Sequence, residues 1–167
     1  RLRELRPGGG FTLAPEAASE HLRAAINKPI SAEQLLETAE NIFRHGWNSI
    51  KLYFMIGHPE ETLEDVQAIV DTCKTLLAVG RRICGGKARI HVSVGTFIPK
   101  PHTPFQWVAC DSLENIQAKQ DLLKSQLRRN PSIKLSWVDP QTTLLEAFLS
   151  RGDRRTADVI ERAWRNG

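Results

Sequence analysis

Four side chains that could take part in acid–base or hydrogen-bonding chemistry occupy alternating positions of two strand-like runs. Lys51 and Tyr53 share one face of the first run, and His91 and Ser93 share one face of the second. An amine, a phenol, an imidazole and a hydroxyl can all transfer protons or orient a substrate. We predict that these four residues face a substrate, although a sheet with one face open to water produces the same alternation.

The turn that follows the first of these runs is a second candidate site. It reads Gly-His-Pro-Glu-Glu-Thr over residues 57–62 and directly precedes a helical pattern. In folds built from βα units, ligands bind at the carboxyl ends of the strands. A carboxylate beside a helix N-terminus is also favoured by the helix dipole, so Glu61 is equally well explained as a structural residue.

Strand-like and helical patterns alternate along the whole chain. Strands are expected over 11–14, 49–56 and 89–98, with a possible short strand over 134–138. Helices are expected over 20–26, 31–45, 62–80, 111–129, 139–150 and 156–164. This order predicts an α/β fold in which a parallel sheet buries its aliphatic face under the helices.

Composition narrows the class of protein. The chain has 167 residues, one domain or a little more, and a net charge of +4, which is no nucleic-acid signature by itself. Three widely separated cysteines match no metal-binding spacing, so we expect no metal ligands and reduced thiols in a cytoplasmic protein. No apolar run is long enough to span a membrane.

Three segments, taken together and in order, resemble a known enzyme superfamily. Residues 14–20 (APEAASE), 55–62 (MIGHPEET) and 97–104 (FIPKPHTP) are similar to the fourth-, fifth- and sixth-strand elements of radical S-adenosylmethionine (SAM) barrels, with methylthiotransferase-like motifs. The strings also resemble an uncharacterised group that pairs a radical SAM domain with a cobalamin-binding-like domain.

The resemblance implies a fold and a domain division. We expect a partial (β/α) TIM-like barrel, namely strands 4–6 of a six-stranded barrel, over residues 1–110. A mainly helical C-terminal extension is expected over residues 111–167. The expected partners are the N-terminal half of the same barrel and, because a partial barrel exposes strand edges, a second copy of the chain.

The resemblance also implies which residues bind SAM. They are Glu16, Ser19, Met55, Ile56, Gly57, Glu61, Phe97, Ile98 and Pro99. Glu16 takes the position of a family glutamine whose side chain reaches the ribose, and His58 replaces a family phenylalanine. The segments 55–57 and 97–99 correspond to those that support the adenine through apolar packing and backbone hydrogen bonds.

In this superfamily three cysteines of a C-x3-C-x2-C loop hold a [4Fe–4S] cluster. Reductive cleavage of SAM at this cluster yields a 5′-deoxyadenosyl radical that abstracts hydrogen from the substrate. The loop belongs before the first strand seen here, and the chain does not contain it. We therefore expect the chain to be an inactive piece of a longer enzyme whose cofactors are SAM, the cluster and possibly cobalamin.

Two other functions fit the sequence. One is a different βα-barrel enzyme that uses Glu61, His91 or Lys51 for acid–base chemistry. The other is a non-catalytic module whose arginine-rich helices bind RNA or another protein. Neither pattern identifies a substrate.

Overall fold

A four-stranded parallel sheet with strand order β1-β2-β3-β4 forms the centre of the fold. The computed structural model describes residues 10–167, so the first nine residues of the predicted 1–110 segment lie outside it. The strands are β1 (Phe11–Glu16), β2 (Ser49–Ile56), β3 (Arg89–Thr96) and β4 (Ile133–Trp137). The α/β prediction is confirmed, and the sheet is consistent with part of a β/α barrel.

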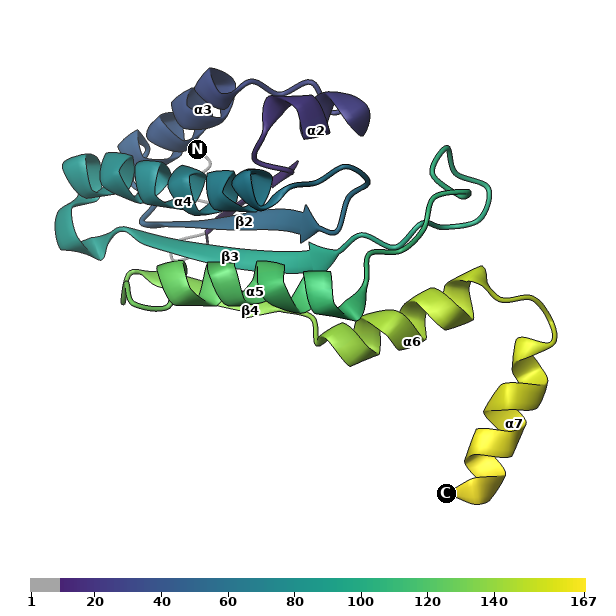
Figure 1. Cartoon of the computed structure of the whole chain (residues 1–167). Coiled ribbons are helices and arrows are strands. Elements are labelled where there is room, and N and C mark those ends of the chain that lie inside the picture. The colour runs from purple at the N-terminus through teal and green to yellow at the C-terminus, as the bar shows by residue number, and fades with distance from the viewer. Residues whose placement is uncertain (1–9) are drawn as a thin grey trace.

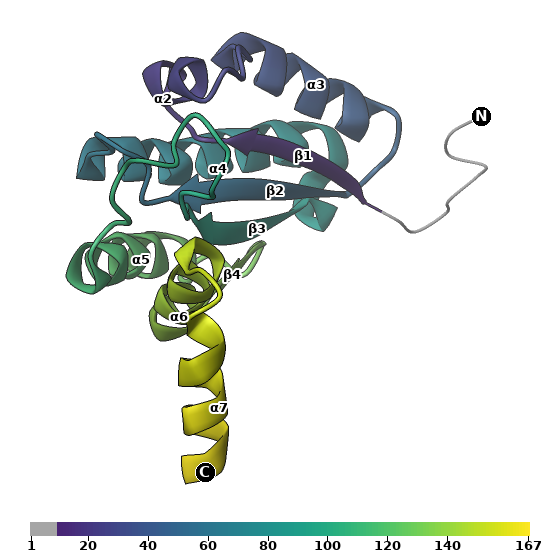
Figure 2. The ribbon, with the colours of Figure 1, turned by 90° about the vertical axis from the view of Figure 1, so that its right-hand side faces the viewer.

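The larger helices form one layer on one face of the sheet (Figures 1 and 2). The helices are α2 (Glu20–Ala25), α3 (Ala32–Arg44), α4 (Leu63–Cys84), α5 (Leu113–Leu127), α6 (Pro140–Arg151) and α7 (Thr156–Asn166), with a 3-10 turn at Gly85–Lys87. Helices α3, α4 and α5 pack beside one another over the sheet. Helices α6 and α7 lead away from this layer, and α7 projects from the body of the molecule.

The register of the sheet separates its two faces. Ile50, Ile90 and Ile133 are neighbours on the face beneath the helices, and all three are buried. Burying such aliphatic side chains supplies most of the stabilisation of the sheet. On the opposite face, His91 is exposed and Lys51 is half-buried, so the predicted aliphatic and mixed faces are confirmed.

Strand β4 is a full member of the sheet, although its sequence suggests only a short strand within a mainly helical segment. It pairs in parallel with β3 over the five positions Ile133–Trp137. The cationic ends of Lys124 of α5 and of Arg128, which caps the helix, lie over the ring of Trp137, at 4.8 and 5.1 Å from its centroid. Helix α5 therefore covers β4, and the domain division after residue 110 stays a prediction.

Local sequence signals determine most of the helix ends. Ser31 begins α3 with the predicted capping box, because its hydroxyl accepts from the Gln34 N–H and the Gln34 side chain accepts from the Ser31 N–H. The prediction that Gly80 ends α4 is wrong, since the helix continues to Cys84. A Cβ at Gly80 would lie 2.6 Å from the ring of Phe43, so this glycine permits close packing of α3 against α4.

Helix α7 has a polar and an apolar side but buries none of its residues. Its large apolar side chains, Val159, Ile160 and Trp164, are all more than half exposed. Over residues 10–167, no helix is both long enough and apolar enough to cross a membrane.

Candidate ligand site at the carboxyl ends of the strands

The three predicted SAM-binding segments meet at one edge of the sheet. The parallel strands β1, β2 and β3 are neighbours, so Glu16, Ile56 and Thr96 end them on the same side. Pairing continues one residue beyond β3, where the Phe97 N–H donates to the Ile56 carbonyl oxygen over 2.8 Å. The structure therefore brings segments from distant parts of the sequence together where βα folds bind ligands.

Glu16 ends β1 in a strained backbone conformation. Its φ of 68° lies in the left-handed region, which a residue with a Cβ adopts only at a cost. The Lys28 ammonium donates to Oε1 of Glu16 over 3.0 Å, and both side chains remain partly exposed. The turn that follows is held by Arg23, whose guanidinium donates to the carbonyl oxygens of Ala17 and Ala18.

Ser19 occupies the N-cap position of α2 with extended backbone, as predicted, but its side chain makes no capping hydrogen bond. Its Oγ is buried and has no hydrogen-bond partner among residues 10–167. A hydroxyl left in this state costs free energy unless a further group meets it. The predicted contact between Ser19 and SAM stays a prediction.

His58, in the turn after β2, forms an aromatic group with Phe97 and Phe105. The His58 ring is 4 % exposed and its centroid lies 5.0 Å from that of Phe97, which in turn lies 5.4 Å from that of Phe105. Neither ring nitrogen of His58 has a hydrogen-bond partner in the described part of the chain. Burial lowers the pKa of His58, which favours the neutral form of the ring.

Gly57 and a buried ion cluster fix the turn after β2. The φ of Gly57 is +84°, and a Cβ there would lie 3.3 Å from the Cβ of Asp111. The Gly57 N–H donates to Oε2 of Glu61 over 2.6 Å. The Lys119 ammonium of α5 lies 2.7 Å from Oε2 of Glu61 and 2.7 Å from Oδ2 of Asp111. The cluster ties the β2–α4 turn to the start of α5.

Burial and the bonds within this cluster shift the pKa values of its members in opposite directions. The side chains of Glu61, Lys119 and Asp111 are 2 %, 8 % and 13 % exposed. Burial raises the pKa of Glu61 despite the hydrogen bond from Lys119. Burial alone would lower the pKa of Lys119, but its bonds to the two carboxylates outweigh it and raise that pKa. The bonds from Lys119 and Asn115 likewise outweigh burial and lower the pKa of Asp111.

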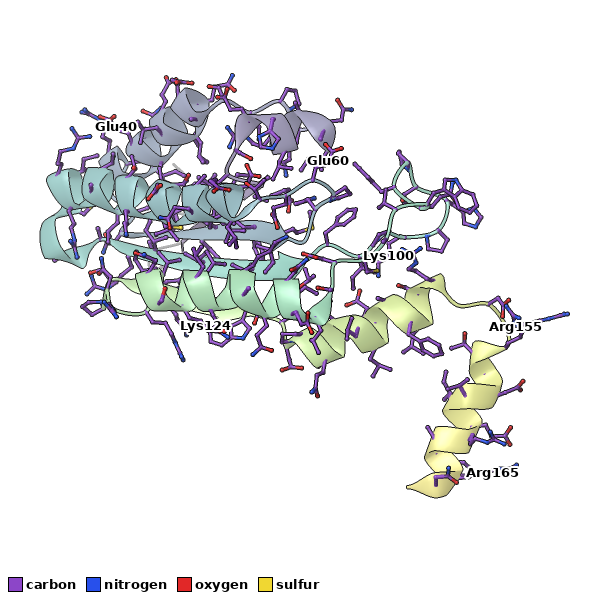
Figure 3. All side chains as sticks on the ribbon, in the orientation of Figure 1. Glu40, Glu60, Lys100, Lys124, Arg155 and Arg165 are labelled. Atoms are coloured by element: carbon purple, nitrogen blue, oxygen red, sulfur yellow. The ribbon has the colours of Figure 1, made fainter. Side chains whose placement is uncertain are left out.

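A cavity of about 370 Å³ opens beside this cluster. Its wall includes His58 and Glu60 from the β2–α4 turn, Cys110 and Asp111 from the segment just before α5, and Lys119 from α5 itself. Glu60 also has a positive φ, 64°. In the view with side chains, the labelled Glu60 marks this turn near the N-terminus of α4 (Figure 3).

The loop between β3 and α5 extends beyond the strand ends. Lys100 in this loop forms an ion pair of 2.7 Å with Glu146 of α6, and Figure 3 shows Lys100 between the loop and α6. The Arg151 guanidinium donates to the Val108 carbonyl oxygen over 2.8 Å. Trp107, in contrast, is 87 % exposed in the described part of the chain.

The remaining predicted site residues divide by face. Met55 is half-buried on the open face, whereas Ile56, Ile98 and Pro99 are buried. The predicted substrate-facing residues do lie together: Lys51 pairs in register with His91, and Tyr53 with Ser93. Lys51 Nζ donates to the Tyr53 hydroxyl over 2.5 Å. Their role toward a substrate stays a prediction.

Sequence reasoning missed Lys119 and Asp111, because nothing in the alternation or capping patterns marks a long-range ion pair. It also missed Lys134, which β4 places next to His91. The available signal was that Lys119 interrupts the apolar face of α5. In the structure this lysine is buried, with 6 % of its surface exposed.

The described residues do not fit an iron–sulfur cluster. Burial raises the pKa of Cys73 to about 12, which keeps this thiol protonated inside the core. Within residues 10–167, no group of three or more Cys, His, Asp or Glu side chains is arranged to hold a metal ion. Any cluster ligands would have to come from another segment.

Comparison with known proteins agrees with the geometry. Residues 1–73, less than half of the chain, match the model of the Radical SAM superfamily. The uncharacterized protein MJ0966 of Methanocaldococcus jannaschii is 30% identical over 153 residues, which are 90% of this chain and 32% of that relative. The chain thus spans about a third of the length of this relative.

A solved structure supports the fold. The crystal structure of SuiB from Streptococcus suis superimposes with a TM-score of 0.50 over 77% of this chain and 26% of that chain. The sequence identity is 11%, so the likeness concerns the fold alone.

Proposed function

We propose that this chain forms the adenosyl-binding side of a radical SAM enzyme. One observation carries the proposal: the three segments that resemble SAM-binding elements end side by side at the carboxyl edge of a parallel sheet. Full-length members of the superfamily use SAM and a [4Fe–4S] cluster, and the chain itself supplies the SAM side alone.

The residues at the edge have suitable chemistry for a nucleoside. The Glu16 carboxylate is partly exposed and, among residues 10–167, accepts only from Lys28 through Oε1, so it can accept from ribose hydroxyls as well. The Phe97 ring, which contacts the rings of buried His58 and half-buried Phe105, offers an apolar surface to the adenine.

In this proposal the ion cluster of Glu61, Lys119 and Asp111 holds the turn at Gly57 in place beside the cavity. Glu61 is 2 % exposed and already binds Lys119 and the Gly57 N–H, so it positions the turn. This geometry also argues against the alternative of an ordinary acid–base enzyme that uses Glu61, because the carboxylate cannot reach a substrate without breaking the cluster.

The open face of the sheet is the expected contact for the rest of the enzyme. Tyr53 on this face is 38 % exposed, and no helix within residues 10–167 covers it. We propose that the N-terminal half of the same barrel stands opposite this face across the barrel interior and brings the cluster cysteines. Reductive cleavage of SAM is the chemistry that the cluster supplies there, and cobalamin is a second cofactor that the sequence resemblance admits.

A titration with S-adenosylhomocysteine tests the nucleoside site without a cluster. We expect amide NMR shifts at Met55, Gly57 and Phe97 that saturate, and an affinity about tenfold lower in Glu16→Ala, which loses the ribose acceptor. Glu40→Ala on α3, which breaks only a surface ion pair with Arg44, is the matched control. Shifts that are absent, or that do not change in Glu16→Ala, would overturn the proposal.

A further inference from the structure

A row of basic side chains crosses the open face of the sheet. The register places Lys51 of β2 beside His91 of β3, and His91 beside Lys134 of β4. Neighbouring strands are about 4.8 Å apart, so the three side chains leave the sheet next to one another. His91 and Lys134 are exposed and Lys51 is half-buried, so all three are accessible to a ligand.

The row lacks a compensating negative charge in the described part of the chain. Between residues 10 and 167, none of the three side chains takes part in an ion pair. Arg89 lies on the same face, two residues before His91 in β3. Within the described residues its guanidinium donates only to the carbonyl oxygens of Gly86 and Ala88. Lys51 and Lys134 carry like charges on the two strands that flank β3, about 10 Å apart, and an anion bound between them would be attracted by both.

Hydroxyl groups lie between this row and the strand ends. Tyr53, Ser93 and Ser136 are neighbours in the next row of the same face. Met55 lies in the row after that, at the edge proposed to hold the nucleoside. Successive rows are two residues apart, so about 13 Å separates the basic row of Lys51 from the row of Met55.

We propose that the row Lys51–His91–Lys134 binds an anionic group, a carboxylate or a phosphate, of the enzyme's substrate. The inference rests on the proposed function, since it assumes that the reacting atom lies near Met55. It defines the substrate class as a molecule with an anionic end, a middle that hydrogen-bonds hydroxyl groups, and a reacting carbon about 13 Å from the charge. Two cationic nitrogens and an imidazole on one side suit such an end.

Amide NMR titrations of the chain with inorganic phosphate and with acetate, each against NaCl of the same ionic strength, test this row. We expect saturable shifts at Lys51, His91 and Lys134 that NaCl does not reproduce. The preferred anion identifies whether the substrate group is phosphate-like or carboxylate-like. The double variant Lys51→Gln, Lys134→Gln should lose at least about tenfold in affinity. Lys74→Gln on α4 removes the same charge from the other face and should leave the affinity unchanged.

Two results would overturn the inference: shifts that NaCl reproduces, or an anion affinity that the double variant retains. The S-adenosylhomocysteine titration on the same samples separates this from the proposed function. A response at Gly57 and Phe97 without an anion response leaves the proposed function standing and refutes the row. An anion response without a nucleoside response supports the row as an anion site and refutes the proposed function.

Discussion

Replacing Lys119 by Met removes the positive charge between two buried carboxylates. The Lys119 side chain is 8 % exposed, and Glu61 beside it is 2 % exposed, so water cannot replace the lost ammonium without opening the turn. Removing one partner of a buried ion pair costs about 3–5 kcal/mol in free energy of unfolding. Domains of this size are stable by roughly 5–15 kcal/mol, and such a loss would lower the melting temperature by roughly 10 °C.

Urea unfolding at pH 7, followed by circular dichroism, measures this loss. Lys74→Met is the matched control, because Lys74 is exposed and its ammonium only donates to the Gln126 side chain. We expect the control to stay within about 0.5 kcal/mol of the original chain. In Lys119→Met, Glu61 and Asp111 repel each other, so the deficit should shrink as the pH falls and one carboxyl group takes up a proton. A Lys119→Met chain as stable as the control would refute this account of the cluster.

Three further outcomes follow from the structure. The pKa of Asp111 is lower in the folded chain than in the unfolded chain, where it is about 3.9. Its contribution to stability is therefore present above the unfolded pKa and is lost as the pH falls below it. The variant Asp111→Asn should flatten this part of a stability–pH profile. Gly80→Ala should destabilise the chain by about 1–3 kcal/mol in urea unfolding, because its Cβ meets Phe43 at 2.6 Å, whereas Gly86→Ala, with open space around it, should change little. Deleting residues 153–167 should leave the melting temperature unchanged within about 2 °C, since α7 buries no residue; a larger drop would show that α7 packs on the body.

Local patterns predicted much of the fold. The bounds of β2 match the expected strand over 49–56, and the capping box at Ser31 forms as its spacing indicates. Both features depend on neighbours within a few residues, so the sequence carries the information directly. Asp139 with Pro140 at the start of α6 is a further case, because the cap and the fixed φ of proline act within one turn.

Long-range packing explains what the sequence did not reveal. Gly80 looks like a helix end, but the contact with Phe43, 37 positions earlier in the chain, gives it a place inside α4. Strand β4 is short and its alternation of apolar and polar residues is weak. It forms because the edge of β3 offers backbone groups with which it can pair. The partners Glu61 and Lys119 are 58 positions apart, and only the folded chain brings them to 2.7 Å.

The candidate site shows the same division. The segments around Glu16, Gly57 and Phe97 were identifiable because their motifs are contiguous, and the parallel sheet brings them together. The aromatic contact of His58 with Phe97 and the basic row completed by Lys134 depend on strand neighbours, which a single sequence does not state.

Reading the coding sequence that precedes Arg1 in the gene tests the central claim most directly. The proposed radical SAM enzyme requires three cysteines in a C-x3-C-x2-C loop after a strand-like run, because the described residues hold no cluster site. We predict such a triplet roughly one to two hundred residues before Phe11, in line with a barrel of about 200 residues or more. An upstream frame without the triplet would contradict radical SAM chemistry for this protein and leave the nucleoside site without its reaction.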